Sequence, residues 1–511
     1  MVAQVLSCAV WGINATLVKV EANIDLHHLP YFATVGLPEG AVKESKERVS
    51  AAIKNSGYYS LRGKITVNLA PADIKKEGSA YDLPMAIGIL AALGEIKTDL
   101  LNDYAILGEL ALDGSIRPIR GALPIAIEIT RLGLRGLIVP PENAKEAAMA
   151  NGVSVYPMKS LQETIQFLNG EIQFIPYKIE LTEVFKQSHR YEIDFSDVKG
   201  QGHSKRALEV AAAGGHNIIM IGPPGSGKTM LAKRLPTILP DLSLAEALET
   251  TKIHSVAGLL PPNTALIATR PFRSPHHTIS DAALIGGGHI PRPGEVSLAH
   301  HGVLFLDELP EFKKNVLEVL RQPLEDGKVT ISRVTISLDY PANFMLAAAM
   351  NPCPCGFFTD PNNSCTCSPP QIQKYLARVS GPLLDRIDIH LEVPAVKYKE
   401  LAGGSTGDTS REIRDRVKKA RDIQLKRFED RKNLYCNADM ESKEIRKFCL
   451  IDEKGEELLK TAITRLGLSA RAYDRILKVS RTIADLSSSP GISAQHVSEA
   501  IQYRSLDRNF T

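Results

Sequence analysis

Uninterrupted apolar runs mark the middle of the chain. Residues 218–221 (IIMI), 303–306 (VLFL) and 344–350 (FMLAAAM) contain no polar side chain. Runs of this length are typical of parallel strands that helices cover on both faces. Apolar residues at helical spacing occur at 204–213 and again at 469–484. The pattern predicts an α/β core in which a parallel sheet is flanked by helices.

The first 170 residues show a different pattern. Residues 64–69 alternate between polar and apolar positions, whereas residues 79–93 are small and apolar, as in a helix that lies against a sheet. A strand is expected at 105–112 and a further helix at 122–132. Residues 1–170 are therefore predicted to form a separate α+β domain.

Two stretches without clear periodicity divide the rest of the chain. Residues 171–193 are mixed in character, and residues 396–410 include the flexible tract AGGSTGDT. We predict that both are linkers. They leave the α/β core at 194–395 and a helical domain at 411–511.

Length and composition are those of an ordinary globular protein with about three domains: 511 residues, 44% hydrophobic and 23% charged. The net charge of +3 does not by itself indicate nucleic acid, so an anionic partner has to be inferred from local features. No apolar run is long enough to cross a bilayer, and the first residues lack the basic region and cleavage signature of a signal peptide. We expect a cytoplasmic protein without a membrane partner.

The first apolar run leads directly into a phosphate-binding motif. Residues 222–229 (GPPGSGKT) match the pattern G-x-x-x-x-G-K-[ST] at every position. Glycines let such a loop bring backbone N–H groups to phosphate oxygens, and the next helix directs its positive end at the same anion. Lys228 is expected to bind the β- and γ-phosphates of ATP, and Thr229 to bind Mg²⁺. The expected nucleotide-binding residues are Gly222, Pro223, Pro224, Gly225, Ser226, Gly227, Lys228, Thr229 and Met230.

The other two apolar runs end in residues that suit ATP hydrolysis. Asp307 and Glu308 follow the second run, at the edge of the sheet where a ligand is expected. Asp307 is expected to bind Mg²⁺ through its water shell, and Glu308 to polarise the attacking water. Asn351 follows the third run, where its amide can orient that water or sense hydrolysis. The set predicts hydrolysis rather than nucleotide storage.

Two exposed features are candidate DNA contacts. Arg273, His276 and His277 lie in Gly- and Pro-rich loops, where we expect contacts to substrate or to a neighbouring subunit. A metal site built from the histidines of this region is the alternative. Residues 328–338 (KVTISRVTISL) alternate with a change of phase near Arg333, which predicts a hairpin with Arg333 at or near its tip. In a ring motor such a hairpin can grip a phosphate backbone, and an amphipathic hairpin without that role is the alternative.

Four of the seven cysteines form two C-x-C pairs separated by turn-forming residues. Cys353, Cys355, Cys365 and Cys367 can close around a tetrahedral Zn²⁺. Reduced free thiols are one alternative, and disulfide pairing is another.

Three arginines are candidates for contacts to ATP. Arg386, with Arg378 as the second choice, is expected on a surface that faces the next subunit, where it can stabilise transition-state charge in trans. Arg471 lies in the first turn of the helix predicted at 469–484, from which it can reach back to the γ-phosphate. The periodicity of that helix predicts that Tyr473 is buried.

The N-terminal domain is similar to the domain that carries the Ser–Lys dyad of Lon proteases, with KEGSA at 76–80 near the nucleophile segment. The dyad lysine is expected after Gly121, where the sequence reads GALP. A serine without a base is a weak nucleophile. We therefore expect Ser79 to start a helix and the domain to serve packing or binding.

Four blocks of sequence together resemble one family. They are KITVNLAPADIKKEGSAYDLPMAIGIL, FRSPHHTISDAALIGGGHIPRPGEVSLAHHGVLFLDELPEF, SGPLLDRIDIH and SARAYDRILKVSRTIADL. They are similar to the Mg-chelatase-like AAA+ ATPases of the YifB/ComM family. The resemblance implies a core of the helix-2-insert group, a degenerate Lon-like N-terminal domain, an α-helical C-terminal lid and a ring of six subunits.

The resemblance also implies a function. It implies ATP-driven branch migration on single-stranded and branched DNA in natural transformation or recombination. A magnesium-chelatase-type or protein-remodelling ATPase that does not act on DNA is the alternative. By resemblance, residues 198–201 contact adenine. The roles implied for single residues are Lys228, Thr229, Asp307 and Glu308 as the hydrolytic set, Asn351 as the sensor, Arg386 as the arginine finger and Arg471 as the lid sensor.

Overall fold

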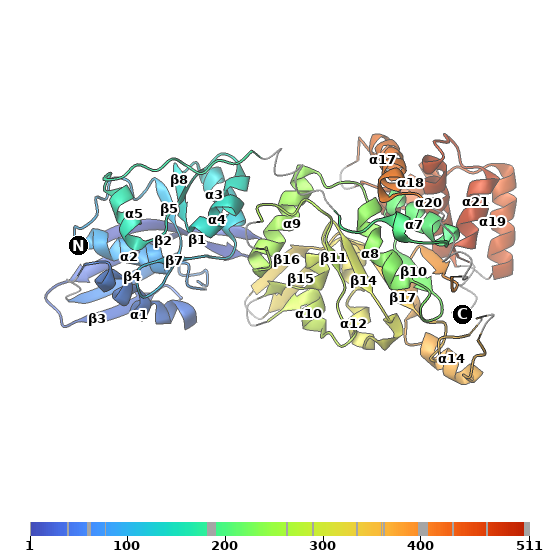
Figure 1. Ribbon diagram of the computed structural model, residues 1–511, viewed down its shortest axis with the longest axis horizontal. Helices are drawn as coiled ribbons and strands as arrows, with labels where there is room; N and C mark the ends of the chain where they lie inside the picture. The colour runs from blue at the N-terminus through green and yellow to red at the C-terminus, as the bar shows by residue number, and fades with distance from the viewer. Residues whose placement is uncertain are drawn as a thin grey trace. The chain divides into compact units, whose positions relative to one another are not determined.

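The computed structural model (Figure 1) describes residues 2–37, 40–58, 63–76, 78–180, 191–261, 264–288, 291–333, 336–358, 360, 363–396, 407–431, 434–466 and 469–504. The chain packs into two compact units, each with its own sheet and apolar core. Unit 1 comprises Met1–His189 and Leu244–Ala268, and unit 2 comprises Arg190–Ser243 and Thr269–Thr511.

Unit 1 contains a mixed seven-stranded sheet. Its strands are β1 (Val2–Trp11), β2 (Asn14–Asp25), β3 (Tyr31–Val35), β4 (Lys64–Ala70), β5 (Tyr104–Ile106), β8 (Gly136–Val139) and β9 (Ser154–Pro157). Their order is β3-β4-β2-β1-β5-β8-β9. β2 is antiparallel to both β1 and β4, and the other neighbouring strands are parallel. The short strands β6 (Glu109–Leu110) and β7 (Ile116–Arg117) form a separate antiparallel pair.

Helices cover both faces of this sheet. They are α1 (Gly40–Asn55), α2 (Asp82–Ala92), α3 (Ala122–Leu132), α4 (Pro141–Ala147), α5 (Leu161–Leu168) and α9 (Leu244–Ala257), with a 3-10 turn at Ala148–Ala150. Alternate residues of β8 join different cores: Ile138 packs in the cluster that contains α2, whereas Leu137 and Val139 pack in the cluster that contains α3. All of α2 is buried because it lies between the sheet and helices α1 and α5, which explains its run of small and apolar residues.

Three features of unit 1 differ from the prediction. The helix expected at 79–93 begins at Asp82, so Ser79 does not start it. The strand expected at 105–112 is divided into β5 and β6 at Gly108, whose missing Cβ would lie 2.5 Å from Ile116 Cγ2. Residues 244–268 were assigned to the core at 194–395, but α9 packs against α3, and Ser255 donates a 2.5 Å hydrogen bond to Glu146.

Unit 2 contains a parallel five-stranded sheet. Its strands are β10 (Ile218–Ile221), β11 (Phe272–Arg273), β14 (Val303–Leu306), β17 (Met345–Met350) and β18 (Ile389–Glu392), in the order β11-β14-β17-β10-β18. Every residue of β10, β14 and β17 is buried, which confirms the strands predicted from the apolar runs. The order places β17 between the strand before the phosphate-binding motif and the strand before the acidic pair.

The helices of unit 2 are α7 (Gly202–Gly214), α8 (Lys228–Ile238), α10 (Asp281–Ile285), α11 (Glu295–Leu298), α12 (Lys314–Glu318), α13 (Arg321–Asp326), α14 (Pro369–Leu376), α15 (Gly381–Leu384), α17 (Ser410–Arg427), α18 (Ser442–Phe448), α19 (Glu453–Leu466), α20 (Ala470–Leu486) and α21 (Ala494–Gln502), with 3-10 turns at Phe195–Asp197, Leu309–Glu311 and Asn437–Asp439. One apolar core joins the sheet, α7, α8 and the C-terminal helices. Within the described ranges, no helix is long and apolar enough to cross a membrane.

Two antiparallel pairs complete unit 2: β12 (Gly286–Gly287) with β13 (Arg292–Pro293), and β15 (Lys328–Arg333) with β16 (Ile336–Pro341). The second pair confirms the predicted hairpin, with Arg333 as the last residue of β15, paired with Ile336. The prediction for Tyr473 is wrong, because this side chain on α20 is 38% exposed. Ile476, three residues further along α20, packs in the apolar core instead.

Candidate functional site

The phosphate-binding motif joins the C-terminal end of β10 to the N-terminus of α8. Two of its glycines are required by geometry. A Cβ at Gly222 would lie 2.1 Å from the Val393 carbonyl oxygen. Gly227, which precedes α8, has φ of +88°, a left-handed conformation that favours glycine. The loop therefore passes close to the chain after β18 before it turns into the helix.

The side chain of Lys228 folds back onto this loop. Its ammonium group donates to the carbonyl oxygens of Gly222 and Pro223 at 2.8 and 2.9 Å, and to Asn351 Oδ1 at 3.3 Å. Burial lowers the pKa of Lys228, and the nearby charge of Asp307 opposes this shift. A phosphate anion would compensate the same burial, so the loop fits the polyphosphate of a nucleotide.

Thr229 and Asp307 form the second part of the site. Thr229 Oγ1 donates a 2.7 Å hydrogen bond to Asp307 Oδ2, although the two residues are 78 positions apart. The parallel strands end at the same edge of the sheet, which brings Asp307 at the end of β14 to the start of α8. An adjacent hydroxyl and carboxylate are the oxygen donors that Mg²⁺ prefers, so this pair fits a bound Mg²⁺.

Glu308 has a contact that the sequence did not predict. Its backbone is left-handed, with φ of +52°, and its N–H donates to Asp307 Oδ1 at 2.9 Å. The Glu308 side chain is 58% exposed, and His277 Nδ1 lies 3.2 Å from its carboxylate. His277 was predicted to contact DNA, whereas the structure brings it to the candidate hydrolytic group. No sequence signal links residues 31 positions apart that lie on separate loops.

The other residues of the loop before α10 have internal partners. Arg273 forms two 2.6 Å hydrogen bonds with the carboxylate of Glu295. The ring of His276 lies 4.1 Å from that of His277, and its Nδ1 is 3.0 Å from Thr278 Oγ1. The expectation that Arg273 and His276 contact DNA stays a prediction.

The candidate arginines lie around the turn before β18. Arg386 is ion-paired with Glu325, and its side chain is only 16% exposed. Arg471 is 68% exposed and lies 3.2 Å from Asp385. Arg378 lies 3.0 Å from Glu311 and is half exposed. No contact of Arg471 with the phosphate-binding loop is among the described interactions, so its first partner is the residue next to Arg386.

A cavity of about 460 Å³ lies between α7 and α17. Val198, Gly200, Lys205 and Arg416 are among its lining residues. The adjoining Gln201 has φ of +53° and donates a 2.6 Å hydrogen bond to the Ser226 carbonyl of the phosphate-binding loop. The segment for which adenine contact was implied therefore touches the loop and a cavity that can take a base.

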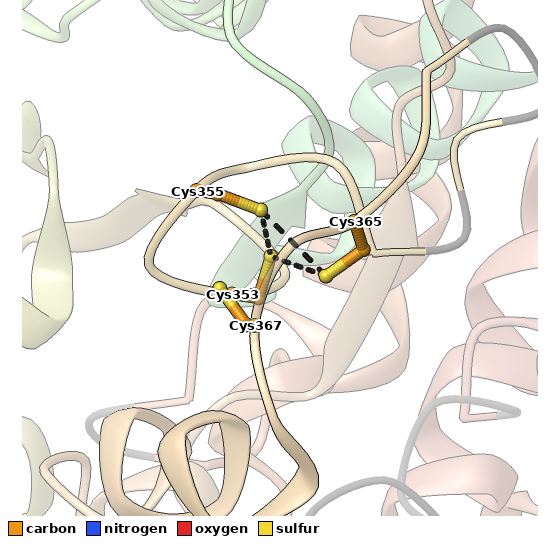
Figure 2. A group of neighbouring side chains, drawn as sticks. All are labelled: Cys353, Cys355, Cys365 and Cys367. Carbon is orange, nitrogen blue, oxygen red and sulfur yellow. Dashed lines mark hydrogen bonds between the residues drawn. The ribbon is translucent and has the colours of Figure 1, made fainter.

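The four clustered cysteines converge from two turns (Figure 2). Their Sγ atoms all lie within 4.8 Å of one another, and the three measured separations are 3.3, 3.6 and 3.7 Å. These are contacts between free thiols, not disulfides, because an S–S bond is about 2.05 Å long. Disulfide pairing is therefore not present among them.

The sulfur atoms are also placed as acceptors. Backbone N–H groups of Phe357 and Thr366 lower the pKa of Cys355 to about 5. The pKa values of Cys365 and Cys367 are raised, since desolvation and the neighbouring sulfurs outweigh the N–H bonds that they accept. Four thiolates this close would repel one another, and a cation at their centre would compensate that repulsion. The donor set fits Zn²⁺.

In unit 1, Ser79 Oγ donates a hydrogen bond to the Glu109 carboxylate. The buried Lys76 donates to the Pro71 carbonyl. Among the described contacts, Ser79 has a carboxylate partner rather than a lysine. The arrangement agrees with the absence of a lysine after Gly121 in the sequence.

Three family models match successive parts of the chain. The model for magnesium chelatase subunit ChlI matches residues 194–401, that for subunit ChlI of Mg-chelatase residues 20–143, and that for the ChlI C-terminal region residues 407–504. The chain is 45% identical to the competence protein ComM of Haemophilus influenzae over 509 residues, which cover 99% of this chain and 98% of ComM. The chain belongs to the YifB/ComM family.

The chain is also similar to two further proteins, over different lengths. Escherichia coli YifB is 45% identical over 501 residues, which cover 98% of this chain and 96% of YifB. Lon protease 2 of Bacillus subtilis is 28% identical over 144 residues, which cover 28% of this chain and 26% of that protease. The predicted family and the α/β fold class are confirmed. Membership in this magnesium-chelatase-like AAA+ family suggests ATPase activity and implies ATP and Mg²⁺, which the loop and the Thr229–Asp307 pair fit.

Proposed function

We propose that this YifB/ComM member is a ring-forming, ATP-hydrolysing DNA motor. Its substrates would be single-stranded and branched DNA, and its activity branch migration or translocation in natural transformation or recombination. The observation that carries this proposal is the identity along almost the whole chain to a protein named for competence. The convergence of Lys228, Asn351 and Asp307 at one edge of the sheet supports the ATP-driven part.

The hydrolytic roles follow from position. When bound, Mg²⁺–ATP supplies the phosphoanhydride bond to be cleaved. Lys228 would hold phosphate oxygens, Thr229 and Asp307 would hold the cation, and Asn351 would orient the attacking water or sense hydrolysis. Glu308 polarises the attacking water, and its exposed carboxylate leaves room for that water.

Hexamer formation is supported by the position of the arginines. Arg471 contacts Asp385, the residue before Arg386, so the lid arginine and the candidate finger share one surface. Arg386 would complete the ATP site of a neighbouring subunit, and Arg471 would reach the γ-phosphate from the lid. In such a ring the finger stabilises charge on the transferred phosphoryl group.

The hairpin of β15 and β16 is our first candidate for DNA contact, through Arg333 at the end of β15. Arg273 already pairs with Glu295, and His277 contacts Glu308. We therefore expect these two residues to contribute less to DNA affinity than Arg333. We also infer that the ion held by the four cysteines is Zn²⁺.

ATP hydrolysis in the presence of different DNAs tests the proposal. The rate is measured without DNA and with single-stranded, duplex or four-way branched DNA at several salt concentrations. We expect stimulation by single-stranded and branched DNA that weakens as salt rises, because phosphate contacts release counterions. Arg333→Ala should reduce this stimulation, whereas Lys328→Ala, at the other end of β15 and paired with Asp339, is the matched control.

A different outcome would favour the other candidate. ATP hydrolysis without stimulation by any DNA would argue for a chelatase-type or protein-remodelling motor. Lys228→Ala serves as the inactive reference in every condition.

A further inference from the structure

The four-cysteine segment lies directly beside the nucleotide site. It starts two residues after Asn351, at the end of β17, and it ends at Ser368, which caps α14. Residues 359, 361 and 362 of the connection lie outside the described part of the chain. The four sulfur-bearing residues and the turn at Gly356 are described. The cluster is therefore fixed at both ends by elements of the AAA+ core.

The sulfur positions suit one tetrahedral Zn²⁺. A Zn–S bond of about 2.3 Å gives a tetrahedron with S–S edges of about 3.8 Å. The separations from Cys365 Sγ to Cys353 Sγ and Cys355 Sγ are 3.7 and 3.6 Å, and Cys353 Sγ to Cys355 Sγ is 3.3 Å. Figure 2 shows Cys367 completing the group.

Backbone N–H groups support each sulfur atom. Phe358 N–H donates to Cys353, the N–H groups of Phe357 and Thr366 to Cys355, that of Cys367 to Cys365, and that of Cys355 to Cys367. Hydrogen bonds of this kind orient metal ligands. The segment thus presents four oriented acceptors rather than a chance group of thiols.

One face of this cluster contacts the phosphate-binding loop. Gly356 is buried, has φ of +87°, and lies between two of the cysteines in sequence. A Cβ on Gly356 would lie 2.5 Å from Pro224 Cδ and 2.7 Å from Pro224 Cγ. The backbone of the cysteine turn therefore packs directly against the Pro224 ring. The next two residues of the phosphate-binding loop are Gly225 and Ser226.

A second contact reaches the sensor position. The backbone N–H of Asn351 donates to the hydroxyl of Tyr375, which lies buried on α14 after the last cysteine. Asn351 Oδ1 in turn accepts from Lys228. The cysteine turn thus lies against Pro224 of the phosphate-binding loop, and the helix that follows the turn contacts Asn351 through Tyr375.

We propose that Cys353, Cys355, Cys365 and Cys367 bind one Zn²⁺ that acts as a structural support for the phosphate-binding loop, so that zinc loading controls nucleotide affinity. The inference rests on the proposed ATP site. Without the ion, the turn at Gly356 loses the cross-link that holds it against Pro224. Nucleotide binding then has to order the phosphate-binding loop, and the free energy of this ordering weakens nucleotide affinity.

Zinc content and nucleotide affinity, measured on the same samples of full-length protein, test this proposal. Zinc is measured by elemental analysis before and after treatment with a zinc-selective chelator in excess Mg²⁺, and after zinc is restored. The dissociation constant of a fluorescent ATP analogue is measured at each stage. We expect one zinc per chain, and a loss of affinity of about tenfold or more on removal that zinc restoration reverses.

Variants separate the metal from the contact. Cys365→Ser should lose both zinc and affinity, whereas Cys8→Ala, a buried thiol on β1 in unit 1, should lose neither. Gly356→Ala should keep zinc yet weaken nucleotide binding, because its methyl group displaces Pro224. Gly133→Ala is its matched control: φ there is +70°, and a Cβ would meet no atom within 4 Å.

Two results would overturn the proposal. Less than about a tenth of an equivalent of zinc in reduced, chelator-free protein would remove the metal site. Equal nucleotide affinity with and without zinc would remove the support role and leave the ATP site intact. Zinc-loaded protein that binds no more nucleotide than Lys228→Ala would instead refute the proposed ATPase function.

Discussion

Glu308→Gln separates nucleotide binding from hydrolysis. The substitution keeps the size of the side chain and removes the charge that we propose polarises the attacking water. Loss of a general base lowers a rate by about 10²–10⁴-fold, which is about 3–5 kcal/mol of transition-state stabilisation. We therefore expect the steady-state ATPase rate to fall by at least about a hundredfold.

Nucleotide affinity should change much less. The Glu308 side chain is 58% exposed, and its described side-chain contact is with His277 rather than with a residue of the phosphate-binding loop. An exposed pair of this kind contributes at most about 1 kcal/mol, so the dissociation constant should change by less than about fivefold. The left-handed backbone of Glu308 and its hydrogen bond to Asp307 do not depend on the side-chain charge.

The assay measures the ATPase rate and the binding of a fluorescent ATP analogue on one preparation. Glu318→Gln is the matched control, because this glutamate lies on α12 and pairs with Arg321. A Glu308→Gln protein that hydrolyses ATP at near the wild-type rate would assign the general base to another residue. A protein that loses nucleotide binding as well would show that Glu308 belongs to the phosphate cradle.

Two further predictions follow from the same geometry. Arg386→Ala should leave ATP affinity near normal and lower hydrolysis steeply, and mixing it with Lys228→Ala protein should restore some activity at hybrid interfaces; no recovery at any ratio would argue against a finger in trans. Asn217→Ala should lower the free energy of unfolding in a denaturant titration by about 2–4 kcal/mol, because it removes hydrogen bonds to the Arg386 carbonyl and the Leu346 N–H. A change below about 1 kcal/mol would show that water replaces both bonds.

Sequence patterns predicted which residues meet at the candidate ATP site because the relevant signals are local. The apolar runs of β10, β14 and β17 report burial on both faces, and the residues that follow them lie at one edge of a parallel sheet. The convergence of Thr229 with Asp307 then follows from strand direction alone. The predicted helix start at Ser79 is wrong, because α2 begins at Asp82 and the Ser79 hydroxyl donates to Glu109, 30 residues away.

The sequence by itself therefore determined the family, the parallel sheet, the phosphate-binding loop and the acidic pair. Each of these is recognisable from a short run of consecutive residues. Only the tertiary structure decided that His277 contacts Glu308, that Arg471 lies beside Asp385, and that Gly356 supports Pro224. These contacts join segments whose separation along the chain is set by loop paths and packing. No period or motif encodes them, since each loop finds its place only against surfaces that the folded core provides.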